Sequence, residues 1–183
     1  MSKQALILID LQHDYFANGL WPLDNIEPAA ANAARVLAAF RQAGKPVIHV
    51  RHESLAADAP FFRPGTPGAQ IHGAVAPAAN EPVIVKHYPN SFRETELHAL
   101  LAQHGIESLV LVGAMSHMCI EAAGRAAADL GYGVTVLHDA CATRELVFDG
   151  HTVPAAQVHA GAMAALAFGY AQLLATEAFL AQG

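Results

Sequence analysis

The stretch from Ser108 to Cys119, Ser-Leu-Val-Leu-Val-Gly-Ala-Met-Ser-His-Met-Cys, carries the strongest signal for the fold. Its first five residues hold no charge and are rich in aliphatic side chains, which is typical of a strand covered on both faces. The segment Ser116–Leu130 has the length of a helix, and Gly131 follows it as a C-terminal cap. The pattern predicts a buried strand that leads into a helix, with Cys119 near the start of that helix.

The same unit of a short apolar run and a helix-length segment recurs along the chain. The other predicted strands are Ala5–Ile9, Pro46–Arg51, Glu81–Lys86, Gly133–Leu137 and Tyr170–Ala175, and the other predicted helices are Glu27–Ala43, Thr95–His104, Pro154–Ala167 and Glu177–Leu180. Strands that alternate with helices indicate right-handed βαβ units and a parallel sheet. We expect one domain, residues 1–183, with the α/β fold of a three-layer α/β/α sandwich around an open, six-stranded, mostly parallel sheet. The segment Glu53–Asn80, rich in proline and glycine, is predicted to be a long loop that covers or forms a site.

The composition excludes several classes of protein. The 183 residues are 54% hydrophobic and 14% charged, which is incompatible with general disorder. The formal net charge of −6 argues against nucleic acid or an anionic membrane as a partner. No apolar run suits a signal peptide or a membrane span, and two cysteines make no disulfide framework, so we expect a cytoplasmic protein with free thiols. The low charge indicates that part of the surface is covered in an oligomer, and together with the family resemblance described below it implies a homodimer or homotetramer.

Three residues with catalytic chemistry are predicted at the carboxyl ends of parallel strands, where such sheets place their sites. Asp10 ends the first strand, Lys86 ends the third, and Cys119 follows the fourth. A helix N-terminus and a nearby ammonium both favour a thiolate, so we expect Cys119 to be ionised. Asp10 could transfer a proton to a leaving amine, and N–H groups of the first helical turn could hold an oxyanion.

Each of these residues alone also has an ordinary structural interpretation. A cysteine in an alanine-rich segment is more often a buried small hydrophobe than a nucleophile. Asp10 could cap a helix or bind a metal, and Lys86 could be a solvated strand end. Cys141 also follows a predicted strand, but no helix signal comes directly after it, and we expect it to be structural. The combination of acid, amine and thiol at three strand ends is what favours catalysis.

Four segments resemble the isochorismatase-like cysteine hydrolases, in the order of that family and across essentially the whole chain. They are Ile7-Leu-Ile-Asp-Leu-Gln-His-Asp-Tyr-Phe16, Val83-Ile-Val-Lys-His-Tyr-Pro-Asn-Ser-Phe92, Leu111-Val-Gly-Ala-Met-Ser-His-Met-Cys-Ile-Glu121 and Val136-Leu-His-Asp-Ala-Cys-Ala-Thr143. The resemblance implies a six-stranded parallel sheet flanked by helices and a catalytic triad of Asp10, Lys86 and Cys119. It also implies a cis peptide bond between Ala114 and Met115, with the N–H groups of Met115 and Cys119 as the oxyanion hole.

Within that family, the residues favour hydrolysis of a C–N bond. The isochorismatases lack the cysteine nucleophile, which this chain retains, so the resemblance implies an acyl-thioester route on a small amide or carbamoyl-type substrate. The nicotinamidases hold a metal with an Asp-x-His pair after the second strand, and here His49-Val-Arg-His-Glu53 lacks the aspartate. We therefore expect no metal and no other cofactor. The stretch Pro60–Gly68, with Ser116-His-Met118, is similar to the amidohydrolases grouped with streptothricin hydrolase.

Other side chains near the predicted crevice could contact the substrate. Aromatic rings there suit a planar or apolar acyl group, and the predicted substrate-binding residues are Phe16, His52, Phe61, Tyr88 and His117. Subunit packing and ordinary polar contacts would explain the same residues. Two further functions stay open, a binding protein whose triad is unused and a metal-assisted, nicotinamidase-like amidase.

Overall fold

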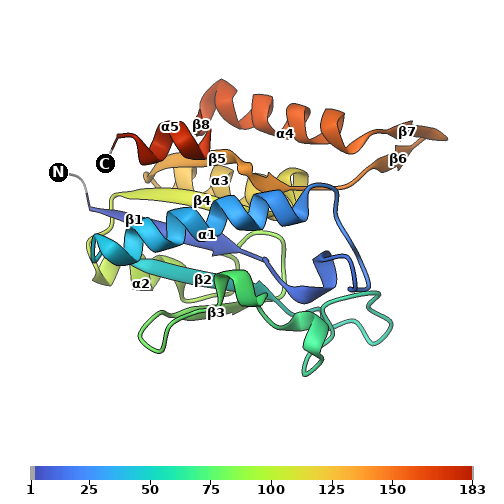
Figure 1. Ribbon diagram of the computed structural model, residues 1–183, viewed down its shortest axis with the longest axis horizontal. Coiled ribbons are helices and arrows are strands. Elements are labelled where there is room, and N and C mark those ends of the chain that lie inside the picture. The colour runs from blue at the N-terminus through green and yellow to red at the C-terminus, as the bar shows by residue number, and fades with distance from the viewer. Residues whose placement is uncertain (1–2, 183) are drawn as a thin grey trace.

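The computed structural model describes residues 3–182 and contains a main sheet of six strands, all parallel (Figure 1). The strand order is β3-β2-β1-β4-β5-β8. The strands are β1 (Gln4–Ile9), β2 (Val47–His52), β3 (Val83–Lys86), β4 (Ser108–Ala114), β5 (Gly133–Ala142) and β8 (Gln172–Leu174). The chain first builds outward from β1 to β3 and then returns to place β4 on the other side of β1. The point where the order reverses therefore lies between β1 and β4, at the centre of the sheet.

Helices cover both faces of this sheet and confirm the predicted α/β/α sandwich (Figure 1). The helices are α1 (Ile26–Gln42) and α5 (Thr176–Leu180) on one face, and α2 (Leu97–Gln103), α3 (Glu121–Asp129) and α4 (Ala155–Gly169) on the other. The side chains of β1 alternate between the two cores, with Leu6 and Leu8 toward α1 and with Ile7 and Ile9 toward α2 and α3. Among the helices of residues 3–182, none has the length and apolar character needed to span a membrane.

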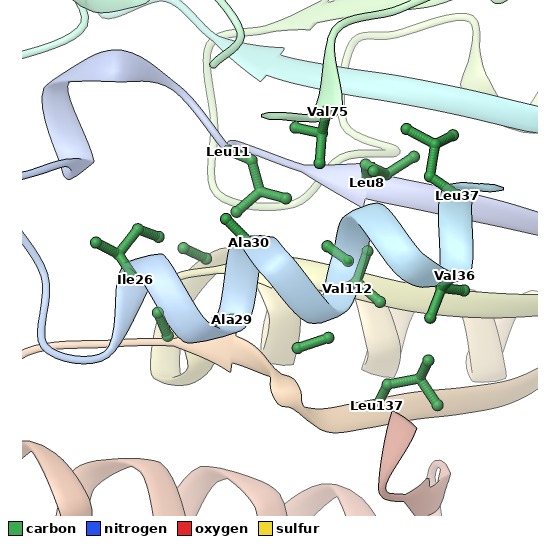
Figure 2. Close-up of a cluster of buried hydrophobic side chains, with 14 of the residues drawn as sticks. Leu8, Leu11, Ile26, Ala29, Ala30, Val36, Leu37, Val75, Val112 and Leu137 are labelled. Carbon is green, nitrogen blue, oxygen red and sulfur yellow. The ribbon is translucent and has the colours of Figure 1, made fainter. Parts of the chain in front are cut away.

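The core between α1 and the sheet shows why the alanine-rich segment forms a packed helix (Figure 2). Val36 and Leu37 of α1 are buried against side chains from several strands, among them Leu8, Val112 and Leu137. Near the start of α1, the small residues at positions 29 and 30 let the helix approach the sheet closely. The apolar positions recur at helical spacing, so one face of α1 is buried and the other is left to solvent.

An antiparallel hairpin, which the sequence analysis did not predict, projects beyond the sandwich between β5 and α4 (Figure 1). It consists of β6 (Leu146–Phe148) and β7 (His151–Val153), joined by Asp149 and Gly150. Both turn residues have positive φ angles, 49° and 75°, and an Asp-Gly pair favours this two-residue hairpin turn. The pair is visible in the sequence and was a signal for the hairpin.

Candidate active site

The three predicted catalytic side chains meet at the carboxyl edge of the sheet. The Nζ atom of Lys86 lies 2.8 Å from Oδ2 of Asp10 and 3.2 Å from Sγ of Cys119. Asp10 and Lys86 are fully buried, and Cys119 is 5% exposed. An acid, an amine and a thiol from distant parts of the sequence therefore form one contact group, shielded from bulk water.

The central strands determine where the acid and the thiol lie. Asp10 follows β1 directly and has a φ of 54°, a conformation that non-glycine residues adopt rarely. Next to it, Gly113 of β4 has a φ of 129°, and a Cβ at this position would overlap the carbonyl oxygen of Ile9. Gly113 thus allows β1 and β4 to approach closely at their carboxyl ends.

Cys119 lies in a single turn of π-helix, Ser116–Ile120, which continues into α3. The prediction of one α-helix over Ser116–Leu130 was therefore wrong in its first turn. π-turns are rare and occur frequently at functional sites. The peptide bond between Ala114 and Met115, just before this turn, is cis, as the family resemblance implies.

The charges around Cys119 correct one expectation about the resting state. Burial raises the pKa of the Cys119 thiol, and the adjacent Asp10 carboxylate raises it further, while the Lys86 ammonium opposes them only in part. This balance favours the thiol over the thiolate at neutral pH, against the thiolate expected from the sequence. Strand order alone did not show how deeply the sulfur and the carboxylate are buried together.

Lys86 stays a cation in this environment. Burial alone would lower the pKa of the ammonium, but the Asp10 carboxylate and Cys119 outweigh burial and raise the pKa. Neither carboxylate oxygen of Asp10 accepts a hydrogen bond from residues 3–182, although Oδ2 forms the ion pair with Lys86. A buried acceptor without a partner is costly, and Oδ1 is free to accept a proton.

His52 completes the group around Lys86. Its Nδ1 atom lies 3.0 Å from Nζ of Lys86, and burial together with Lys86 lowers the pKa of the ring to about 4, so the imidazole is neutral at pH 7. Ligand atoms of Asp10, His52 and Cys119 lie within 4.8 Å of one another, a set that could hold a metal ion. The Lys86 ammonium contacts all three residues, and its positive charge opposes a second cation at the same place.

The other predicted substrate-binding residues make their contacts within the protein. Phe16 stacks on His72 at 3.6 Å between ring centroids, and Phe61 stacks on Trp21 at 4.9 Å. The Tyr88 ring lies under the guanidinium of Arg93, and Nδ1 of His117 lies 2.7 Å from Oγ1 of Thr143. Of the five predicted residues, the structure places His52 in direct contact with the triad, and a substrate-binding role for the others stays a prediction.

Gln12 and Asp14 hold the loops around the site, and the sequence analysis assigned them no role. The buried Gln12 side chain bonds both backbone groups of His52, accepting from its N–H at 2.7 Å and donating to its carbonyl at 2.8 Å. Asp14 accepts from the N–H of Phe62 at 2.7 Å and of Leu20 at 3.3 Å. Both lie in the segment Ile7–Phe16. The signal available in the sequence was the presence of polar residues directly after an apolar strand, next to Asp10.

The remaining residues weighed from the sequence lie away from the triad contacts. Cys141 is buried within β5, rather than after it, and burial raises the pKa of its thiol to about 12. His49 and His52 lie on opposite faces of β2, and Nε2 of His49 pairs with Glu81 at 2.9 Å. Glu81 is also bonded by Arg41 at 2.7 Å.

Fold and site together define a three-layer α/β/α protein with a buried acid, amine and thiol at the switch point of its sheet. The chain belongs to the isochorismatase family, because the family model described as Isochorismatase domain matches residues 4–178. Its members are hydrolases, some of which are amidohydrolases.

Similar proteins agree with this assignment. A crystal structure from Oleispira antarctica, described as an isochorismatase hydrolase, superposes with a TM-score of 0.95 at 52% identity, over 98% of this chain and 97% of that one. Streptothricin hydrolase of Streptomyces noursei is 35% identical over 84% of this chain and 55% of its own length. Maleamate amidohydrolase of Pseudomonas putida is 32% identical over 83% of this chain and 75% of its own.

Proposed function

We propose that this protein is a cysteine hydrolase that cleaves the C–N bond of a small amide or carbamoyl-type substrate through an acyl-thioester intermediate. The observation that carries the proposal is the contact of Lys86 Nζ with both Asp10 Oδ2, at 2.8 Å, and Cys119 Sγ, at 3.2 Å. Streptothricin hydrolase and maleamate amidohydrolase, among the relatives, support a hydrolytic reaction of this kind.

The first half of the proposed reaction starts from the neutral thiol. Asp10 takes the proton of Cys119 as the sulfur attacks the substrate carbonyl carbon, and the Lys86 ammonium stabilises the developing thiolate. The carbonyl oxygen becomes an oxyanion held by the N–H groups of Met115 and Cys119. Asp10 then gives its proton to the amine nitrogen, so that the C–N bond breaks and the acyl group stays on sulfur.

The second half reverses the roles of the same groups. Water takes the place of the amine, Asp10 removes one of its protons, and the resulting hydroxide attacks the thioester carbon. The C–S bond breaks, the acid leaves, and the sulfur recovers a proton from Asp10. The proposed cycle consumes one water for each bond cleaved and requires no cofactor.

The experiment that tests this function traps the intermediate. A panel of small amides and carbamoyl compounds is incubated with the protein, and acid-quenched samples are analysed by intact-protein and peptide mass spectrometry. We expect an acyl adduct on Cys119 that disappears as the acid accumulates. Cys119→Ala is expected to lose both adduct and turnover.

The matched control is Cys141→Ala, because Cys141 is equally buried but lacks the acid and the amine. This variant is expected to retain both adduct and turnover. Turnover that persists in Cys119→Ala would exclude the covalent route, and turnover abolished by chelators would favour the metal-assisted alternative. Tight binding of an amide without turnover or adduct would favour a binding protein. A homodimer or homotetramer, which we also propose, is tested by light scattering after size-exclusion chromatography.

A further inference from the structure

The ammonium of Lys86 has three close polar neighbours within the site. An ammonium has three donors and no acceptor. Its neighbours are Oδ2 of Asp10 at 2.8 Å, Nδ1 of His52 at 3.0 Å and Sγ of Cys119 at 3.2 Å. The first and third contacts belong to the proposed triad, whereas the contact with His52 has no role in that mechanism.

Strand register explains why the His52 ring lies beside Lys86. His52 of β2 is directly paired with Lys86 of β3 in the parallel ladder, so the two side chains lie on the same face. The buried Gln12 side chain bonds both the N–H and the carbonyl of His52. The ring is therefore held against the ammonium by the sheet on one side and by Gln12 on the other.

The contact with Lys86 determines which ring nitrogen of His52 carries the proton. Lys86 can only donate, so Nδ1 must accept, and a neutral imidazole then has its proton on Nε2. The low pKa of the ring, about 4, agrees with a neutral imidazole. Among residues 3–182, no hydrogen-bond partner is present for Nε2, and the ring is half-buried rather than enclosed. The Nε2–H group is thus an unused donor on a ring whose other nitrogen contacts the Lys86 ammonium.

We infer that His52 is a positioning and specificity residue, which orients the Lys86 ammonium through Nδ1 and presents Nε2–H to a second oxygen acceptor of the substrate. The inference rests on the proposed use of Cys119 as a nucleophile. The preferred substrates are amides whose acyl part carries a carbonyl or carboxylate oxygen within a few bonds of the scissile carbonyl. An amide without that second acceptor would leave the donor unpaired, which sites of this kind disfavour.

The test uses alkylation of Cys119, which needs no turnover. Two reagents of similar size are compared, iodoacetamide, whose carbonyl is an acceptor, and iodoethane, which has none. Rates at Cys119 are measured at pH 8 by peptide mass spectrometry, because the raised pKa of the thiol places its titration midpoint at strongly alkaline pH. Below that midpoint the rate follows the thiolate fraction, so a change of one unit in the thiol pKa changes the rate about tenfold. The variants are His52→Phe, which removes both ring nitrogens, and His52→Asn, whose amide oxygen can replace Nδ1 as an acceptor. The control is His98→Phe, because His98 is an exposed histidine of α2 whose Nδ1 lies 2.9 Å from the Tyr132 hydroxyl.

Two separate results are expected from the His52 variants. In His52→Phe, the alkylation rate of Cys119 by iodoethane at pH 8 falls by about tenfold, because Lys86 is no longer held toward the sulfur and the thiol pKa rises further. In His52→Asn, the iodoethane rate stays near that of the wild type. The rate ratio of iodoacetamide to iodoethane falls by roughly fivefold in both variants, because both lack Nε2–H.

Each other outcome overturns a stated part of the inference. If His52→Phe behaves like His98→Phe in the iodoethane rate and in the ratio, the ring only fills space. An iodoethane rate that falls equally in His52→Asn and His52→Phe removes the role of Nδ1, and an unchanged ratio removes the role of Nε2–H. A wild-type Cys119 that neither reagent modifies would overturn this inference and the nucleophile together. If alkylation behaves as expected but no amide forms an acyl adduct, the proposed function fails while the role of His52 in the site stands.

Discussion

Replacing Lys86 with methionine is expected to destabilise the fold strongly, although methionine fills a similar volume. The ammonium is fully buried and lies 2.8 Å from the Asp10 carboxylate. In Lys86→Met, the carboxylate stays in the interior without its cation, and Cys119 and His52 lose a donor. The cost comes from the unpaired charge rather than from a cavity.

The size of the effect follows from the distance between the charges. Two unit charges at this separation attract by about 6 kcal/mol at an effective dielectric constant of 20. Desolvation of both groups offsets most of this gain, so the intact pair contributes little by itself. In Lys86→Met the desolvation penalty of the Asp10 carboxylate remains, but the attraction that offset it is gone. Broken buried pairs typically cost about 3–5 kcal/mol for this reason. We expect a loss of that size in Lys86→Met and a much smaller loss in Asp10→Asn/Lys86→Met, where both charges are absent.

Urea unfolding measured by circular dichroism, at equal protein concentration for all variants, tests this reasoning. The wild type, Lys86→Met, Asp10→Asn and the double variant form a complete double-mutant cycle. A Lys86→Met protein that unfolds at the wild-type urea concentration would refute the account, because the buried carboxylate would then not need its cation. So would a double variant whose loss equals the sum of the two single losses.

Three other outcomes follow from the charges and contacts of the site. Asp10→Asn should raise the rate of Cys119 alkylation at pH 8 by about tenfold, because a negative charge that raises the thiol pKa is gone, and should slow turnover by about 10²–10⁴-fold. An unchanged alkylation rate would contradict the effect of the Asp10 charge on the thiol. Glu81, whose pKa is lowered to about 2 by hydrogen bonds from Arg41 and other donors, contributes stability above its unfolded pKa of about 4.3, and this is lost as the pH falls toward 2. Acid titration of the unfolding free energy should therefore be flatter between pH 4.3 and 2 in Glu81→Gln than in the wild type. Asp14→Ala leaves the N–H of Phe62 without its acceptor and should cost about 1–3 kcal/mol, with faster proteolysis of the loop as the readout and an unchanged cleavage rate as the contrary result.

The sequence was sufficient to predict the sheet because its strands are short, apolar and followed by helices. The central strand Ser108–Val112 and the acid, amine and thiol after three strands were all found from that pattern. The predicted edge strand Tyr170–Ala175 is shorter in the structure, Gln172–Leu174, and β5 extends to Ala142 rather than ending at Leu137. Strand ends depend on which neighbouring strand is available for pairing, which a single chain segment does not encode.

The electrostatic state of the site was harder to predict than its members. The ionisation of Cys119 depends on the balance between one carboxylate, one ammonium and burial, at separations of about 3 Å. Strand-end positions cannot resolve distances of that size. Phe16 and Phe61 were predicted to contact the substrate because they are aromatic and lie near the crevice, and the sequence did not indicate their ring contacts with His72 and Trp21. Hydrophobicity indicates that a ring will be covered and leaves open which group covers it.

The Asp14 carboxylate has a consequence for engineering the loop that follows β2. Besides its bonds to Phe62 and Leu20, it fills the space where a side chain on Gly68 would lie, since a Cβ there would overlap its oxygens. A library intended to change substrate preference should therefore keep Asp14 and Gly68 fixed and diversify the loop positions between these anchors. Randomising either anchor would mainly disturb the loop, whatever chemistry the new side chains offered.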